Sequence, residues 1–229
     1  PDVDAGPGSL SHCESMHGYD LGMESAPVYL RSAAGVSARP LGAASGRLLD
    51  GTHFVVMSTG ALWRLSPSGW QIAGGFVTAP GSYIPPTTTS FAQFGNSVLA
   101  ASEVSMARSA NGADFVPLAG APRARVSCSQ AGFVLAFDID HAATGVLRNG
   151  WMCSAQHDET DWSRDAAVYS VSGVLIQGSG PITAALPLGP YVIAYKADRT
   201  FIGRHDPGAP YVWAWDVIGS QEIGAQGPD

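Results

Sequence analysis

The sequence predicts an all-β protein, a β-propeller built of four-stranded antiparallel blades. A chain of 229 residues with 28 Gly, 16 Pro and only 14% charged residues has many turns and few solvated helices. Its aromatic and β-branched residues fall in short runs without a helical period. The same order of strand-like runs recurs, with apolar landmarks at positions 54, 98, 133 and 191, a mean step of about 46 residues. This period is typical of propeller blades.

The clearest four-strand unit lies at residues 90–122. A turn at 94–96 leads into a strand at 97–101, and an alternating segment follows at 104–107. A hairpin signal at 109–112 (SANG) then leads to a closing strand at 115–118. A sheet of four short strands that is apolar on both faces has to stack against similar sheets.

Residues 1–39 are predicted to form an irregular arm, rich in Gly, Ser and acidic residues, and residues 40–229 to form the blades. The blades are expected at about 40–75, 85–122, 123–165 and 178–220. Residues 222–229 (EIGAQGPD) resemble the first turn of a further unit. Because propellers close with four to eight blades, the ring is either closed by these four or completed by further residues or other chains.

Each unit is predicted to end in a strand with a large aromatic side chain. We expect these side chains to fill the wedge between adjacent blades, because large rings supply most of the apolar area that such a wedge needs. They are Trp70, Phe115, Trp162 and Trp213.

Charge and cysteine content exclude several classes of protein. The net charge of -7 and the pI of about 5.2, with a single lysine (Lys196) and scattered arginines, argue against specific nucleic-acid binding. The three cysteines (Cys13, Cys128, Cys153) are too few for a disulfide framework and are interpreted as reduced thiols. No run approaches the roughly 20 apolar residues of a membrane helix, so no membrane insertion is expected.

A turn signal at residues 109–115 resembles the Asp-box hairpin of sialidase-type propellers, through Ser109, Asn111 and Gly112. That motif is a structural turn in which the Asx side chain satisfies backbone amides. A sialidase-like site also needs clustered arginines and a tyrosine nucleophile. Tyrosines and acids are present, but no arginine cluster recurs, so glycoside hydrolysis is disfavoured. The residues considered for that site were Tyr169, Tyr191, Tyr195, Asp138 and Asp140.

Potential metal ligands form three groups, and none has the spacing of a known site. We predict no metal, no cofactor, no catalytic residue and no enzymatic activity. The groups are Asp138, Asp140 and His141; His157, Asp158, Glu159 and Asp161; and His12, Cys13 and His17.

Segments along nearly the whole chain, in the same order, resemble the β-propeller structural proteins of tailed bacteriophages and their prophage remnants. They are residues 1–5 (PDVDA), 7–8 (PG), 91–102 (FAQFGNSVLAAS), 119–126 (AGAPRARV), 132–137 (GFVLAF), 153–154 (CS), 160–163 (TDWS), 180–184 (GPITA), 191–196 (YVIAYK), 201–204 (FIGR) and 212–225 (VWAWDVIGSQEIGA). In that family the chains usually continue past the position of Ala225 with further blades, and the Ser-, His- and Met-rich arm departs from its pattern.

The resemblance implies a virion component, similar in architecture to the nozzle proteins of short-tailed phages, with no catalytic residues to carry over. The expected partners are copies of the chain in a ring and other tail or neck proteins, assembled in the bacterial host cytoplasm. An acidic lumen would let DNA pass without binding. The alternative is a carbohydrate-binding propeller that recognises the host surface through residues 138–149 and exposed aromatic side chains.

Overall fold

In the computed structural model, residues 36, 38–76, 87–208 and 211–218 are described in full, and β1 and β2 by their backbone. The chain divides into two units, residues 1–34 and 35–229, which are described separately. The first contains an antiparallel hairpin of β1 (Met16–Tyr19) and β2 (Gly22–Ser25), within the arm for which no regular structure was expected.

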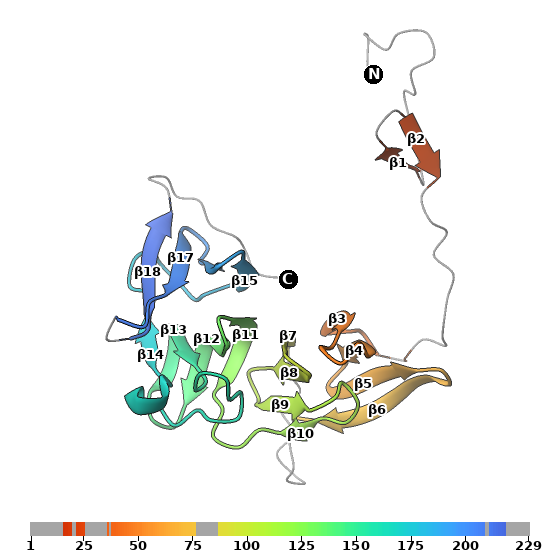
Figure 1. The fold of residues 1–229 in the computed structure, drawn as a ribbon, viewed down its shortest axis with the longest axis horizontal. Coiled ribbons are helices and arrows are strands. Elements are labelled where there is room, and N and C mark those ends of the chain that lie inside the picture. The colour runs from red at the N-terminus through yellow and green to blue at the C-terminus, as the bar shows by residue number, and fades with distance from the viewer. Residues whose placement is uncertain are drawn as a thin grey trace. The chain divides into compact units, whose positions relative to one another are not determined.

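The described residues of the second unit form four antiparallel four-stranded sheets, each made of four consecutive strands in sequence order (Figure 1). This confirms the prediction of an all-β fold with four-stranded antiparallel sheets. The first sheet comprises β3 (Gly42–Arg47), β4 (His53–Ser58), β5 (Ala61–Ser66) and β6 (Gly69–Gly75). The second comprises β7 (Ser90–Phe94), β8 (Ser97–Ala101), β9 (Met106–Ser109) and β10 (Val116–Pro117).

The third sheet comprises β11 (Arg123–Gln130), β12 (Phe133–His141), β13 (Gly145–Cys153) and β14 (Ser172–Val174). The fourth comprises β15 (Ala184–Leu188), β16 (Tyr191–Tyr195), β17 (Thr200–His205) and β18 (Trp213–Ile218). The third sheet differs from expectation at its end, where a closing strand was predicted near residues 160–163. Those residues instead lie in a long connection with a 3₁₀ turn, Ala166–Val168, and β14 follows it.

Consecutive sheets contact each other through their first strands, because β7 lies against both β3 and β11, and β11 lies against β15. In Figure 1 these first strands occupy the same side of the series. Glycine allows the closest approach, since a Cβ on Gly42 would lie 2.0 Å from the carbonyl oxygen of Thr89. The Thr89 amide donates to the Leu41 carbonyl at 3.0 Å, which joins the first and second sheets.

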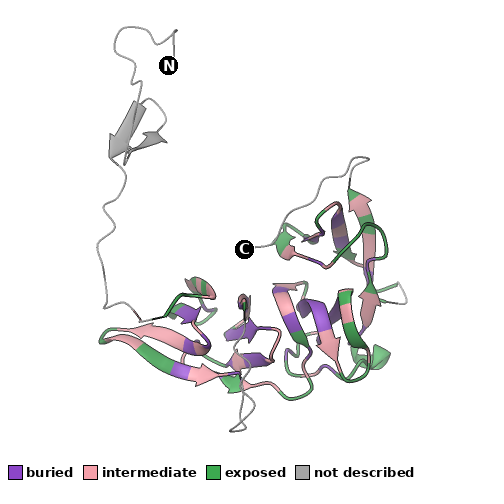
Figure 2. Ribbon diagram, turned by 180° about the vertical axis from the view of Figure 1, so that it is seen from behind, coloured by how far each residue is buried: buried purple, intermediate pink, exposed green. Residues whose placement is uncertain are grey.

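Three core clusters fill the junctions between neighbouring sheets in the described part of the chain. On β8, Val98 and Ala100 face the first sheet, whereas Leu99 and Ala101 face the third. A sheet covered on both faces needs apolar residues at successive positions, unlike a half-exposed strand that alternates. This explains the apolar runs at β8 and β12, where buried residues gather in Figure 2.

Candidate functional site

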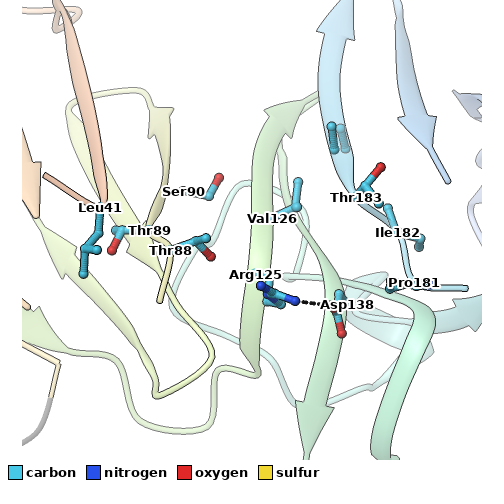
Figure 3. Close-up of a pocket in the computed structure, with 12 residues that line it drawn as sticks. Leu41, Thr88, Thr89, Ser90, Arg125, Val126, Asp138, Pro181, Ile182 and Thr183 are labelled. Atoms are coloured by element: carbon cyan, nitrogen blue, oxygen red, sulfur yellow. Dashed lines mark ion pairs between the residues drawn. The ribbon is translucent and has the colours of Figure 1, made fainter. Parts of the chain in front are cut away.

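A hollow of about 460 Å³ opens where the first strands of the four sheets converge (Figure 3). Each sheet contributes a short segment at or just before its first strand, so residues far apart in the sequence line one space. The lining residues are Leu41, Thr88, Thr89, Ser90, Arg125, Val126, Asp138, Pro181, Ile182, Thr183, Ala184 and Ala185.

Polar contacts fix the walls of the hollow. The hydroxyl of Ser90 donates to the Ser127 carbonyl at 3.2 Å and accepts from the Ser127 amide at 3.0 Å, which joins the second and third sheets. The Ile182 amide donates to the Arg148 carbonyl at 2.9 Å, which joins the third sheet to the segment before β15. Hydrogen bonds between neighbouring sheets therefore hold two walls of the hollow in place.

Asp138 enters the hollow through an irregularity of β12. The pairing of β12 with β13 shifts between Phe137 and Ile139, and Asp138 has a φ of 52°. The strand also changes faces here, since Phe137 packs toward the fourth sheet and Ile139 toward the second. Such irregularities re-aim side chains, and Asp tolerates positive φ better than most residues.

Two arginines balance the buried Asp138 carboxylate. Arg148 donates to its Oδ1 at 3.0 Å, and the Nη1 of Arg125 lies 3.9 Å from its Oδ2. Burial raises the pKa of Asp138, and the hydrogen bond and charge of Arg148, followed by the charge of Arg125, oppose this effect. Burial also acts to raise the pKa of Glu103, but hydrogen bonds from Thr87 and the charge of Arg125 bring it below its ordinary value.

Several polar groups at the hollow have unused hydrogen-bonding capacity within the described residues. The hydroxyls of Thr88 and Thr89 are buried and have no hydrogen-bond partner there. Arg125 is 40% exposed at its side chain and lies too far from Asp138 for a hydrogen bond. No sequence pattern indicates this site, because its residues come together only after four separate sheets pack.

The aromatic side chains predicted to lie between blades take different places. Phe115, Trp162 and Trp213 are buried, in the clusters between the first and second, second and third, and third and fourth sheets respectively. Trp162 lies in the connection before β14 rather than in a strand. Trp70 on β6 is only half-buried and belongs to none of the three clusters.

The Asp-box-like turn connects β9 to the segment before β10, away from the hollow. The Oδ1 of Asn111 accepts from the Ala113 amide at 3.1 Å, and Ser109 is fully buried. Gly112 has a φ of 70°, and a Cβ at this position would lie 3.0 Å from the Cβ of Phe54 in the first sheet. The three residues therefore form a local turn that contacts the neighbouring sheet.

The structure separates the acids and histidines that were considered as metal ligands. Residues 138–149, the segment named for carbohydrate recognition in the alternative function, belong mostly to the β12–β13 hairpin. Asp140 pairs with Arg123 at 3.2 Å, and His141 contacts the Gly120 carbonyl at 3.1 Å. Among the described residues no three such side chains gather to hold a metal ion. His12 and Cys13 lie outside these residues, and only the backbone of His17 is described.

The second acidic group is divided between local turns and a contact across sheets. Asp158 accepts from the Thr160 amide at 2.8 Å, and Asp161 from the Ser163 amide at 2.9 Å. Glu159 instead reaches the second sheet, where it bonds to Ser97 and Arg108. None of the tyrosines Tyr169, Tyr191 and Tyr195 lines the hollow.

Two of the three cysteines are free buried thiols. Burial raises the pKa of Cys128 and of Cys153 to about 12, so both stay protonated at neutral pH. Cys13 lies outside the described residues. These two thiols act as small apolar side chains in the cluster between the third and fourth sheets.

Comparison with known proteins gives no assignment: no protein-family model matches this chain, and no curated protein is similar to it in sequence. In the part of the chain that the structure describes, no helix has the length and apolar character of a membrane span.

Proposed function

We propose that the chain is a non-enzymatic structural protein of a tailed-phage virion. In this proposal its sheets are the blades of a β-propeller, and the propeller is a ring-forming subunit of the tail or neck. The order of sequence segments along the chain supports it, as does the series of four sheets with converging first strands. A series of four packed sheets leaves one face of the first sheet and one face of the fourth uncovered by other described residues. Another blade or a second copy of the chain could pack against these faces.

The observation that carries the proposal is a group of exposed apolar side chains on each end face, beside the Arg204–Asp216 ion pair on the fourth sheet. On the first sheet, Val55 and Ile72 are 36% and 66% exposed, on the face opposite the core. On the fourth sheet four apolar side chains are at least 40% exposed on the face opposite the core. They are Leu186, Leu188, Tyr191 and Ile218. A blade or a copy of the chain would bury these faces as the internal junctions do.

The charge of the chain supports a place beside the DNA path. A net charge of -7 means that the chain as a whole repels a polyanion. The hollow is lined by one arginine and one carboxylate, so it carries no net charge that would hold DNA. Replacing acids that face the ring axis with lysine is expected to slow DNA ejection, and an unchanged rate would argue against the conduit role.

Native mass spectrometry of the purified chain tests assembly. We expect oligomers that dissociate when Ile72→Asp or Leu188→Asp places a charge on an end face, because an unpaired charge in an interface is costly. Val116→Asp on β10 is the matched control, since Val116 is 60% exposed and lies on neither face. A wild-type chain that stays monomeric at every concentration, or a control that dissociates equally, contradicts the proposal.

Proteomics of purified phage particles tests the virion assignment. Particles from a strain that encodes the chain should contain its peptides in a fixed ratio to the other tail proteins. Particles that lack the chain, from cells that express it, would overturn the assignment.

A further inference from the structure

The hollow holds a hydrogen-bond donor and an acceptor side by side, each with unused capacity. Arg148 occupies Oδ1 of Asp138, whereas Oδ2 faces Arg125 across 3.9 Å, beyond hydrogen-bond distance. A guanidinium carries five N–H donors, and the guanidinium of Arg125 makes no hydrogen bond to a described residue. A small molecule with a donor and an acceptor on adjacent atoms could engage both groups.

The other side of the hollow adds two hydroxyls. Thr88 and Thr89 precede β7, and their Oγ1 atoms are buried without a partner among the described residues. Figure 3 shows Thr88 between Thr89 and Arg125 at the edge of the hollow. A buried hydroxyl without a partner is unfavourable, so a bound molecule that pairs with it relieves that cost.

The remaining wall is apolar and of suitable size. Val126, Ile182 and Ala185 also line the hollow, and the volume of about 460 Å³ falls within the range of small-molecule sites. An apolar floor with a few convergent polar groups is the usual composition of such a site.

The charges near the hollow favour a neutral ligand. Arg125 and Arg148 are matched by Asp138 and Glu103, so the set has no net charge. An anion would lie beside the buried Asp138 carboxylate, and a cation beside Arg125. A neutral polyol avoids both, because each hydroxyl donates and accepts.

We propose that the hollow binds a neutral saccharide unit, whose neighbouring hydroxyls donate to Asp138 and accept from Arg125 while another pairs with Thr88 or Thr89. The carbohydrate site then lies where the four sheets converge, not on exposed aromatic side chains. The irregularity that turns Asp138 inward supports this, since a residue with positive φ within a strand is retained where its placement matters. This inference goes beyond the structural role.

Saturation-transfer NMR and calorimetric titration test the inference, with the methyl glycosides of glucose, galactose, mannose, N-acetylglucosamine and glucuronic acid as probes. We expect saturable millimolar binding of at least one neutral glycoside. Arg125→Gln should weaken it at least tenfold, and Thr88→Val about threefold. Thr88→Val removes an unpaired hydroxyl, so it should leave the fold intact.

Arg123→Gln is the matched control, because Arg123 lies on the same strand but not in the hollow and pairs with the exposed Asp140. Its binding should stay within twofold of the wild type. The inference is overturned by no saturable binding of any neutral probe, by equal losses in the Arg123 and Arg125 variants, or by tighter binding of the glucuronoside. These outcomes are independent of the native mass spectrometry experiment, which tests whether the chain forms oligomers.

Discussion

The junction between the second and third sheets and the junction between the third and fourth are built by different means. At the junction between the second and third sheets, the buried Glu159 accepts hydrogen bonds from Ser97 at 2.6 Å and from Arg108 at 2.7 Å. At the junction between the third and fourth sheets, aromatic rings pack together: the ring centroid of Trp213 lies 5.8 Å from that of Phe133 and 6.2 Å from that of Trp215. Junctions of the same repeated architecture are therefore stabilised either by a charge-assisted contact or by ring packing, and only the charge-assisted contact should make stability depend on pH.

The largest effect is expected at the aromatic junction. Trp213→Ala should lower the free energy of unfolding by about 3–5 kcal/mol, because it leaves a cavity in the cluster between the third and fourth sheets. Urea denaturation measures it. Trp213→Phe is the control: the indole N–H is buried without a partner among the described residues, so its loss should keep the cost below about 1.5 kcal/mol. Equal costs for the two variants would contradict this account.

Glu159→Gln tests the polar junction and should cost about 2 kcal/mol at pH 7, because charge-assisted hydrogen bonds are lost. Burial acts to raise the pKa of Glu159, but the bonds from Ser97 and Arg108 bring it below its ordinary 4.5. A lowered folded-state pKa stabilises the fold above pH 4.5, and this contribution is lost as the pH falls through the folded-state pKa.

The difference in stability between the wild type and Glu159→Gln should therefore narrow below pH 4.5, whereas the cost of Trp213→Ala should not depend on pH. Denaturation at pH 7, 5, 4 and 3 measures both. Asp161→Asn is the control, because Asp161 lies in the same connection and its side chain accepts from the Ser163 amide without reaching another sheet among the described residues. A constant Glu159→Gln difference across this range would show that the charge contributes nothing.

A smaller effect is expected from Lys196, which is 1% exposed. Its ammonium group donates to the Leu175 and Gln177 carbonyls at 2.5 and 2.9 Å and lies 5.7 Å from the Phe201 ring. Lys196→Met should cost about 1 kcal/mol, because the lost hydrogen bonds are partly offset by removal of a buried charge. Hydrogen exchange at residues 175–178 should accelerate. Arg204→Met, which removes an exposed cation of the same sheet that pairs with Asp216, should leave that exchange unchanged; an equal acceleration would count against the role of Lys196.

The smallest effect is expected at the turn after β9, which belongs to neither junction. Asn111→Ala removes the acceptor for the Ala113 amide and should cost about 0.5–1 kcal/mol. Thermal denaturation measures it, with Asp114→Ala as the exposed control. A cost above that of Glu159→Gln would mean that the turn matters more than a junction.

The strands that were easiest to predict are those buried on both faces. β8 and β12 read as continuous apolar runs because neighbouring sheets cover them on each side. β14 could not be predicted, since Ser172 and Gly173 favour no strand and the segment is fixed by Trp151. A Cβ on Gly173 would lie 2.9 Å from the indole nitrogen of that tryptophan.

The candidate site was beyond prediction for a related reason. Asp138 was identified as an acid of interest, but its place in the hollow depends on the register between β12 and β13. Thr88, Arg125 and Ile182 carry no motif, and they converge only through contacts between sheets. Local sequence patterns therefore predict most strands of the sheets, whereas the site depends on packing between sheets and cannot be read from such patterns.

The burial of Lys196 has a practical consequence for work with this protein. It is the one lysine of the sequence, and the folded chain hides its amine. Amine-directed dyes, cross-linkers and coupling resins therefore find no lysine on the folded surface. Labelling of Lys196 by such a reagent reports opening of the fourth sheet and can serve as a probe of unfolding.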